Sequence, residues 1–352
     1  MIGAGLAGSL LALALADAGA RVRLQDPAPV PASATGLSYG GVPWWAGPPG
    51  PLAALMATAP ACWQELEARH GPLGWTPCSL RLHWQENCSS AAAAAIESAL
   101  ASLRHLAGAH RPAGEASLCL PYGRVDATCL VHALPAALER AGVERIQAPA
   151  VLAEPLGADQ VVLAAGAGCR SLLPALPSRL RVSWAGLLAV EDAAACRALL
   201  PPAWACAGEI NMPLLGQRQA LEARAAELQA EQWVVDAGLA PWGKGLLLGQ
   251  TSLVRPGLAK GEPPDPRGLE AALRQALAAI APGLAALRAP FHQVPVSFTS
   301  TGLPLAGPVA DRPGLWAFAG ISSPFALVPP LAPLLAAAIA GDRAALARLP
   351  GC

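Results

Sequence analysis

Hydrophobic and polar positions near the start of the chain follow the order of a helix and then a strand. The run from Ser9 to Ala18 is rich in Ala and Leu, which predicts a helix that ends at Gly19. Arg21 to Gln25 (RVRLQ) then alternates polar and apolar residues, which predicts a short strand. A helix followed directly by such a strand is typical of the front half of a βαβ unit.

The pattern changes character in the middle third of the chain. We expect further helices at residues 52–70, 90–106, 125–142, 215–231, 266–280 and after residue 319, and further strands at residues 81–85, 161–163, 181–190, 231–237, 245–254 and 315–319. The middle strands follow one another in an antiparallel-looking order, whereas those near both ends alternate with helices. The pattern therefore predicts an α/β protein with a second domain built on a mixed or antiparallel sheet.

Three glycines stand directly before the first predicted helix. Gly3, Gly5 and Gly8 satisfy G-x-G-x-x-G, in which they permit a tight turn, a close approach of pyrophosphate to the backbone, and close packing of helix on strand. Asp26 follows 23 residues after Gly3, at the end of the next strand, where a carboxylate can accept hydrogen bonds from ribose hydroxyls. This spacing predicts a dinucleotide site, and both nicotinamide and flavin dinucleotides fit it.

The strand that should precede this turn is almost missing. A pyrophosphate turn normally follows a buried strand of roughly five residues, and only Met1 and Ile2 stand before Gly3. Because that strand is central in its sheet, we expect the natural chain to begin a few residues upstream, with an apolar residue before Ile2. A secretory signal explains the same residues less well, because no positive charge precedes the apolar run.

Composition narrows the possible partners and the compartment. Lys and Arg together number 24, as do Asp and Glu, so no net charge favours binding to nucleic acid. No apolar run reaches the ~20 residues of a membrane span, so we expect a soluble chain. The nine cysteines form no CxxC pair and have no histidine at ligand spacing, which predicts free thiols, no metal site and a cytoplasmic location.

Five later segments carry a resemblance when they are taken in order with the glycine turn. They are Ser33 to Gly36 after the second strand, residues 123–142 (GRVDATCLVHALPAALERAG), 158–166 (ADQVVLAAG), 243–252 (GKGLLLGQTS) and 302–320 (GLPLAG to GLWAFAG). This arrangement resembles the D-amino-acid oxidase and glycine oxidase superfamily of FAD-dependent oxidoreductases. The resemblance covers most of the chain, and it rests on the order of the segments more than on any single motif.

The resemblance implies FAD as the cofactor and two domains. A Rossmann-like, glutathione-reductase-like FAD-binding domain is expected from residues 1–80, 118–175 and 296–352, and a substrate domain with a mixed or antiparallel sheet from residues 81–117 and 176–295. The FAD-binding residues that it implies are Gly3, Gly5, Gly8, Asp26, Ser33, Gly36, Ala165, Gly166, Gly320, Ser322 and Ser323.

The implied activity is oxidation of a C–N bond in a small amine or amino-acid-like substrate. The substrate gives a hydride to flavin N5, and the resulting imine is hydrolysed. Two other hypotheses stay open. The protein is a flavin-binding protein with altered or lost catalysis, or it is an oxidoreductase of the same fold that acts on an amine without a free carboxylate.

Two departures from the family favour these alternatives. The family's arginine that binds the substrate carboxylate has no counterpart, because no arginine lies between Arg288 and Arg312. The family's GHSGHG loop is GISSPF here, which places Pro324 and Phe325 where close backbone approach is expected; Ser322 and Ser323 could instead cap the following helix.

Four residues are candidates for the substrate site. Tyr39 and Trp44 follow the second flavin motif and could form a wall of the pocket, although packing within the loop explains them equally well. Arg255 could replace the missing arginine, with an ordinary surface charge as the alternative. Thr299 lies just before the GLPLAG segment and is the fourth candidate.

Overall fold

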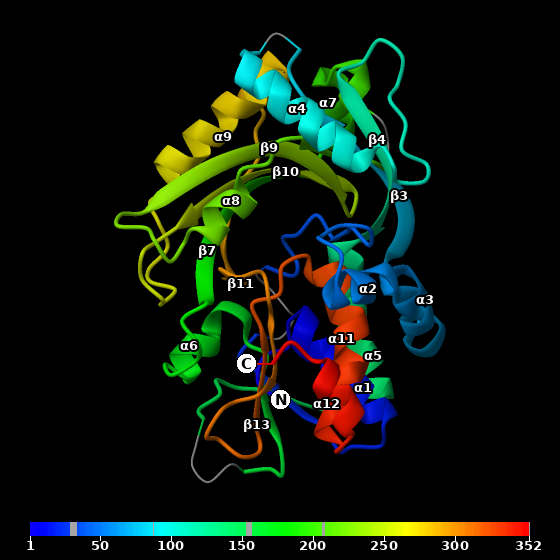
Figure 1. Cartoon of the computed structure of the whole chain (residues 1–352), viewed down its shortest axis with the longest axis vertical. Helices are drawn as coiled ribbons and strands as arrows, with labels where there is room; N and C mark the ends of the chain where they lie inside the picture. The colour runs from blue at the N-terminus through cyan, green and yellow to red at the C-terminus, as the bar shows by residue number, and fades with distance from the viewer. Residues whose placement is uncertain (29–33, 87, 153–156, 206–207, 352) are drawn as a thin grey trace.

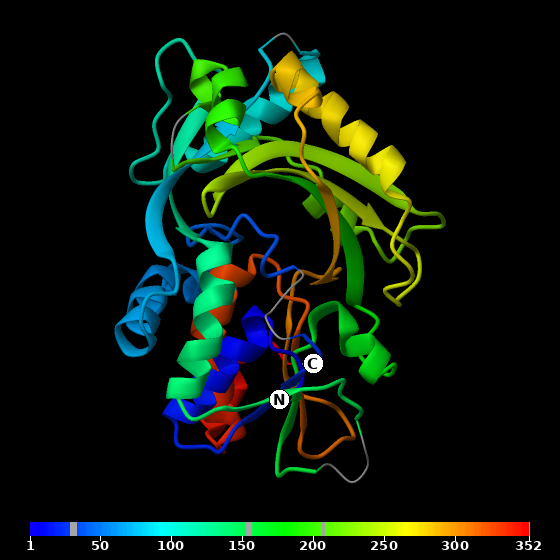
Figure 2. The same cartoon turned by 180° about the vertical axis from the view of Figure 1, so that it is seen from behind.

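The computed structural model describes residues 1–28, 34–86, 88–152, 157–205 and 208–351. It has a lower half, in which helices pack on a small sheet, and an upper half, in which a large curled sheet arches over the lower one (Figure 1). Figure 2 shows the same two halves from behind, with both termini in the lower half.

The helices and strands of the described residues have the following bounds. The helices are α1 (Leu6–Asp17), α2 (Pro51–Ala57), α3 (Ala59–His70), α4 (Ser90–Leu103), α5 (Ala127–Arg140), α6 (Cys169–Leu172), α7 (Ala193–Leu199), α8 (Arg218–Ala223), α9 (Pro266–Ile280), α10 (Pro282–Ala285), α11 (Pro324–Ile339) and α12 (Arg343–Arg348). The strands are β1 (Arg23–Asp26), β2 (Gly41–Val42), β3 (Trp75–His83), β4 (Ser117–Val125), β5 (Glu144–Gln147), β6 (Val161–Leu163), β7 (Leu180–Val190), β8 (Ile210–Pro213), β9 (Gln232–Trp242), β10 (Gly245–Val254), β11 (Phe291–Thr299), β12 (Leu305–Pro308) and β13 (Leu315–Ala319).

The first residues of the chain take the place of the short first strand. Ile2 bridges in parallel to Gln25 of β1 and to Leu163 of β6, and so connects β5-β1 with β6-β13-β12. The N–H of Ile2 donates to the carbonyl of Val162 (2.9 Å), and the N–H of Gly3 donates to that of Gln25 (2.8 Å). The neighbours are parallel as far as β13, and β12 is an antiparallel edge strand. The expected Rossmann-like arrangement is therefore confirmed.

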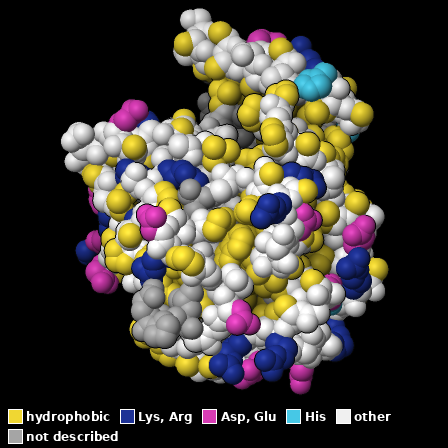
Figure 3. All heavy atoms as spheres, turned by 60° about the horizontal axis from the view of Figure 1, so that its bottom comes forward, with side chains coloured by type: hydrophobic (Ala, Val, Ile, Leu, Met, Phe, Trp, Pro, Cys, Tyr) yellow, Lys and Arg dark blue, Asp and Glu magenta, His cyan; other side chains and the backbone are white. Residues whose placement is uncertain are grey.

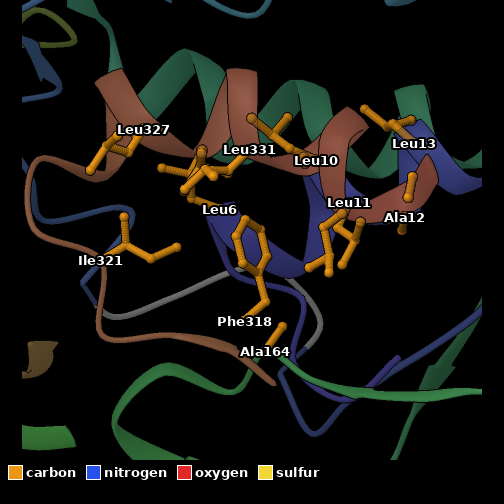
Figure 4. Packing of buried hydrophobic residues seen from close by; sticks show 14 of the residues in the cluster. Leu6, Leu10, Leu11, Ala12, Leu13, Ala164, Phe318, Ile321, Leu327 and Leu331 are labelled. Carbon is orange, nitrogen blue, oxygen red and sulfur yellow. The ribbon is translucent and has the colours of Figure 1, made fainter. Parts of the chain in front are cut away.

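Two very apolar helices cover this small sheet. Leu10, Leu11 and Leu13 of α1 are at most 1% exposed, because α11 covers one side of α1 and the sheet covers another. Figure 4 shows Leu327 and Leu331 of α11 on one side of this core and Phe318 of β13 on the other. A helix that is hydrophobic on all sides is stable in water only when it is enclosed in this way.

The large sheet has eight strands in the order β11-β7-β10-β9-β8-β3-β4-β2. All of its pairs are antiparallel except β3 with β8, so the expected mixed sheet is confirmed. On one face, Leu273 and Leu277 of α9 pack against Leu188, Leu246 and Leu248. The opposite face carries Leu187, Ala189 and Leu247, which contact Leu37 and Tyr39. We call this second face the inner face, because it lies on the underside of the arch in Figure 1.

Several expected elements have different bounds in the structure. The helix expected at residues 52–70 is broken into α2 and α3 at Thr58, because Pro60 begins a new helix. In place of the helix expected at residues 215–231, the structure has only the short helix α8. Leu221, Ala225 and Leu228 pack into one hydrophobic cluster, and the last two of them follow α8 in a non-helical segment. The strand expected at residues 81–85 is β3, whose pairing with β4 begins at Trp75 and ends at His83. Since β2 and β3 begin within residues 1–80, the large sheet takes strands from that range, and the domain boundaries stay a prediction.

The surface of the protein matches its balanced composition. Figure 3 shows basic and acidic side chains scattered among one another over the face that it presents, with no large basic patch there. In the described part of the chain, no helix is long and apolar enough to cross a bilayer.

Candidate functional site

At the glycine turn, backbone segments lie so close together that no side chain fits at Gly3 or Gly8. Gly3 has φ +103°, and a Cβ atom on it would lie 2.6 Å from the carbonyl oxygen of Ala164. A Cβ atom on Gly8 would lie 1.8 Å from the carbonyl oxygen of Gly3. These two glycines therefore let α1 start directly on the carboxyl end of β6, which is the placement that the motif predicts.

The start of α1 presents backbone N–H groups. The N–H of Leu6 donates to Thr35 Oγ1 (3.1 Å), while those of Gly5 and Ala7 have no acceptor among the described residues. A Cβ atom on Gly5 would meet only Thr35 Oγ1, at 3.4 Å. A helix N-terminus of this kind binds phosphate groups, so the turn fits the pyrophosphate of a dinucleotide.

Thr35 is a residue that the sequence did not single out, although it lies within the segment from Ser33 to Gly36. Its hydroxyl contacts the glycine turn itself, as the bond to Leu6 shows. The carbonyl of Gly36 accepts a hydrogen bond from Trp242 Nε1 (2.8 Å), which ties the same segment to the end of β9. Ser33 lies outside the described residues, so its expected role stays a prediction.

Asp26 stands beside the turn at the end of β1. Its Oδ2 accepts from the N–H of Ala4 (2.7 Å) and its Oδ1 from the N–H of Ala28 (2.9 Å), and each oxygen keeps a second lone pair. A pocket of about 230 Å³ opens here, lined by Ala4, Leu24, Asp26, Ala28, Arg145, Ile146 and Gln147. The position fits the adenosine half of FAD, because the pocket lies at the carboxyl ends of the parallel strands β1 and β5.

The residues expected at the cofactor after β6 and after β13 stand at the ends of two neighbouring parallel strands. Ala165 and Gly166 follow β6, and Gly320 follows β13, which pairs with β6 in parallel. Gly320 has φ +67°, and a Cβ atom on it would lie 2.7 Å from Thr299 Cγ2. Thr299 is 4% exposed, and its hydroxyl has no partner among the described residues. A buried hydroxyl without a partner is uncommon, so Thr299 fits a site that a ligand completes.

The GISSPF loop differs from expectation at two points. Ser323 stands at the N-cap of α11 in the left-handed region (φ +50°), and its side chain makes no capping hydrogen bond, so the expected capping by this serine is wrong. Phe325 adds no bulk to the loop surface, because its ring is 2% exposed and stacks on Trp63 with centroids 6.4 Å apart. Pro324 occupies the first helical position, where a missing N–H costs little.

The candidate substrate residues separate into two groups. Tyr39 lies on the inner face of the large sheet, where its hydroxyl donates to the carbonyl of Gly249 (2.8 Å). Burial raises the pKa of Tyr39, so the phenol is neutral at physiological pH. Arg255 instead pairs with Glu231 (3.2 Å) and donates to the carbonyl of Glu262 (2.6 Å), so its donors are engaged away from Tyr39. Trp44 is half-buried and belongs to none of the hydrophobic clusters.

The structure adds one acidic residue of α8, Glu222, to this face. Glu222 is 7% exposed and accepts a hydrogen bond from Ser183 Oγ (3.4 Å) on β7. Ser183 and Leu187 are four residues apart on one strand, so they share a face, and Glu222 lies on the same side of the sheet as Tyr39. The sequence predicts only a helix over residues 215–231, and the position of α8 under the arch becomes visible in the structure (Figure 1).

Comparison with known proteins identifies the family. The model of the DAO family, described as FAD dependent oxidoreductase, matches residues 1–338. The fold is similar to glycine oxidase from Geobacillus kaustophilus (20% identity, TM-score 0.67, 96% of this chain and 92% of that chain) and to iminodiacetate oxidase from Chelativorans sp. BNC1 (20% identity, TM-score 0.69, 97% and 95%). It is also similar to L-amino acid deaminase from Proteus vulgaris (12% identity, TM-score 0.65, 97% and 93%). No curated protein matches the chain in sequence.

These findings agree with the geometry of the glycine turn. The family match spans the turn, the strand before Ala165, the large sheet and most of α11. The structural likeness shows that the whole arrangement of two halves is shared. The chain therefore belongs to the DAO family of FAD-dependent oxidoreductases.

Proposed function

We propose that this FAD-dependent oxidoreductase oxidises a C–N bond in a small amine or amino-acid-like molecule. The observation that carries the proposal is the path of one short segment. Thr35 contacts the glycine turn, and Tyr39, four residues later, contacts the large sheet through the carbonyl of Gly249. The segment from Thr35 to Tyr39 thus joins the glycine turn to the inner face of the large sheet. A substrate bound on that face would therefore lie beside a cofactor bound at the turn.

The chain's own residues have three tasks in this reaction. Leu187, Leu247 and the ring of Tyr39 give an apolar wall that excludes water from the reacting amine. The neutral hydroxyl of Tyr39 orients that wall through its bond to the sheet. The backbone groups at Gly5, Gly320 and the start of α11 would hold the cofactor. When bound, FAD supplies the two-electron acceptor for the hydride, and the imine is then hydrolysed.

The names of the structural neighbours support an amine substrate. Glycine oxidase, iminodiacetate oxidase and L-amino acid deaminase all carry in their names a molecule with an amino group. The burial of Phe325 in the core removes one of the two reasons for expecting lost catalysis. The missing arginine of β11 remains, and it bears on which amines the site accepts.

The test is the visible spectrum of the purified protein, recorded anaerobically before and after addition of glycine, sarcosine, iminodiacetate or an amine without a carboxylate. Bleaching of the flavin by one of these supports the proposal. A yellow protein that none of them reduces contradicts it and leaves a flavin-binding protein without amine oxidation. The control is the same titration with acetate, which has no oxidisable C–N bond.

A further inference from the structure

An open space lies over Gly166, just after the carboxyl end of β6. Gly166 has φ +53°, and a Cβ atom on it would meet one heavy atom of the described residues within 4 Å beyond its chain neighbours, namely Ser297 Oγ at 4.0 Å. Cβ atoms on Gly3 and Gly8, by contrast, would collide with backbone. Ligands bind outside the carboxyl ends of parallel strands, so this open space stands where a cofactor is expected.

Ser297 borders this space from the large sheet. It lies on β11, opposite Val182 of β7, and β11 contacts the 3₁₀ turn Gly166–Gly168. In Figure 1, β11 runs from the arch down into the lower half. The next residue, Phe298, points to the other side of the strand, where it is 2% exposed and packs in one cluster with Val254. Phe298 therefore anchors β11 and holds Ser297 toward the small sheet.

The hydroxyl of Ser297 accepts one hydrogen bond and has a hydrogen left to donate. Its Oγ accepts from the N–H of Gly320 (3.3 Å), the residue that follows β13. A serine hydroxyl also carries one hydrogen, and this hydrogen has no acceptor among the described residues. Ser297 is half-buried, so its oxygen is held in place while its hydrogen can reach a ligand in the space over Gly166.

The order of strands decides which half of FAD lies over Gly166. The small sheet runs from β5 and β1 through Ile2 to β6, β13 and β12. Asp26 and the pocket beside it are at the end of β1, on one side of the glycine turn, whereas Gly166 and Gly320 follow β6 and β13 on the other side. A dinucleotide with its pyrophosphate at the turn and its adenosine at Asp26 would therefore extend its flavin half over β6 and β13.

We propose that the hydroxyl of Ser297 donates a hydrogen bond to an oxygen or nitrogen acceptor of the isoalloxazine ring of FAD. The large sheet then contributes a residue to the cofactor site. This role is separate from the proposed function, because it concerns FAD and holds for any amine. Reduction adds electron density to the ring, so a fixed donor stabilises the reduced flavin more than the oxidised one.

Binding of FAD and of ADP to the full-length apoprotein separates the two halves of the cofactor. ADP has the adenosine and the pyrophosphate but no flavin. We expect S297A to raise the Kd of FAD about 3- to 10-fold and to leave the Kd of ADP unchanged, whereas D26A should raise both. S297T keeps the hydroxyl and should restore the affinity for FAD. Isothermal titration calorimetry measures both ligands, and unchanged ADP binding shows that S297A is folded.

The FAD-loaded protein gives a second readout that needs no substrate. Stepwise chemical reduction against a reference dye measures the midpoint potential of the flavin. We expect the loss of affinity in S297A to be about 10-fold larger for reduced than for oxidised flavin, which lowers the midpoint potential by ~30 mV for a two-electron couple. T301A removes an exposed hydroxyl from the connection after β11, and it should leave the absorption spectrum and the potential unchanged.

Two results would overturn the proposal. One is an S297A protein whose Kd for FAD, absorption spectrum and midpoint potential equal those of the wild type. The other is an equal loss of FAD and ADP binding in S297A, because the hydroxyl then supports the fold around Gly320 and not the ring. If no amine reduces the flavin while S297A shows both expected shifts, the proposed function fails and the contact of Ser297 with FAD stands.

Discussion

The glycine turn is built from backbone, whereas the inner face of the large sheet is built from side chains. At the turn, Gly3 and Gly8 leave no room for a Cβ atom, and the donors are N–H groups of consecutive residues. On the inner face, Tyr39, Leu187 and Leu247 come from three distant segments. The glycine turn therefore depends on local chain geometry, whereas the inner face depends on how the large sheet curls. We expect substitutions in these two regions to have different effects.

The largest expected effect breaks the turn itself. Gly8→Ala places a Cβ atom 1.8 Å from the carbonyl oxygen of Gly3, and backbone cannot yield as a flexible side chain would. We expect loss of bound FAD and a fall in the free energy of unfolding of about 3 kcal/mol or more. Flavin content and thermal unfolding measure both effects. Gly168→Ala is the matched control, since its Cβ atom would lie 3.7 Å from Ala165 Cβ; equal flavin content in the two variants would show that the turn is not closed as described.

The next effect concerns the side chain that supports the turn. Asp26→Ala removes the acceptor of the Ala4 and Ala28 N–H groups as well as the expected ribose contact. We expect FAD to bind about 10- to 100-fold more weakly, because charge-assisted hydrogen bonds are lost. Fluorescence titration of the apoprotein with FAD gives the affinity. Asp159→Ala, at an exposed site, should not change it; an unchanged affinity in Asp26→Ala would remove Asp26 from the site.

A smaller effect tests the inner face through pH. Because burial raises the pKa of Glu222, the folded protein binds a proton there more tightly than the unfolded chain does, and stability falls as pH rises through the folded pKa. Glu222→Gln has no proton to lose at this position, so its stability does not fall in this way as pH rises. At neutral pH its free energy of unfolding should exceed that of the wild type by about 1 kcal/mol, and the difference should shrink toward pH ~4. Urea unfolding at both pH values measures it. Exposed Glu227→Gln is the control, and a Glu222→Gln variant that is less stable at neutral pH would contradict the assignment.

The smallest effect returns to the cofactor side. Ser323 holds φ +50° at the start of α11, which favours glycine. Ser323→Gly should therefore raise stability by about 0.5–1 kcal/mol, seen as an increase of roughly 2 °C in Tm. Ser322→Gly, whose φ is not positive, should lower stability slightly. If both variants shift the Tm in the same direction, the left-handed conformation at Ser323 is not what limits this loop.

The sequence predicted the elements whose signal is local. The run from Gly3 to Asp26 carries its own turn, helix and strand, and the structure confirms each of them at nearly the expected residues. The strands at residues 181–190 and 245–254 were predicted because their apolar residues are nearly continuous, and they are β7 and β10. The helix expected at residues 215–231 was wrong because its composition suits a helix, while packing against Val254 and Phe298 draws the later residues into turns.

By itself, the sequence predicted the glycine turn with Asp26 beside it, because glycine spacing and a carboxylate at a strand end fix backbone positions within about 25 residues of one another. Only the tertiary structure decided which side chains meet on the inner face of the large sheet. The sequence suggested Arg255 as one candidate, and the fold engages it with Glu231 while it brings Tyr39 against Leu187 and Leu247. The physical reason is that strand order and curl in an eight-stranded sheet depend on pairings between distant segments, and no local pattern specifies which side chains they bring together.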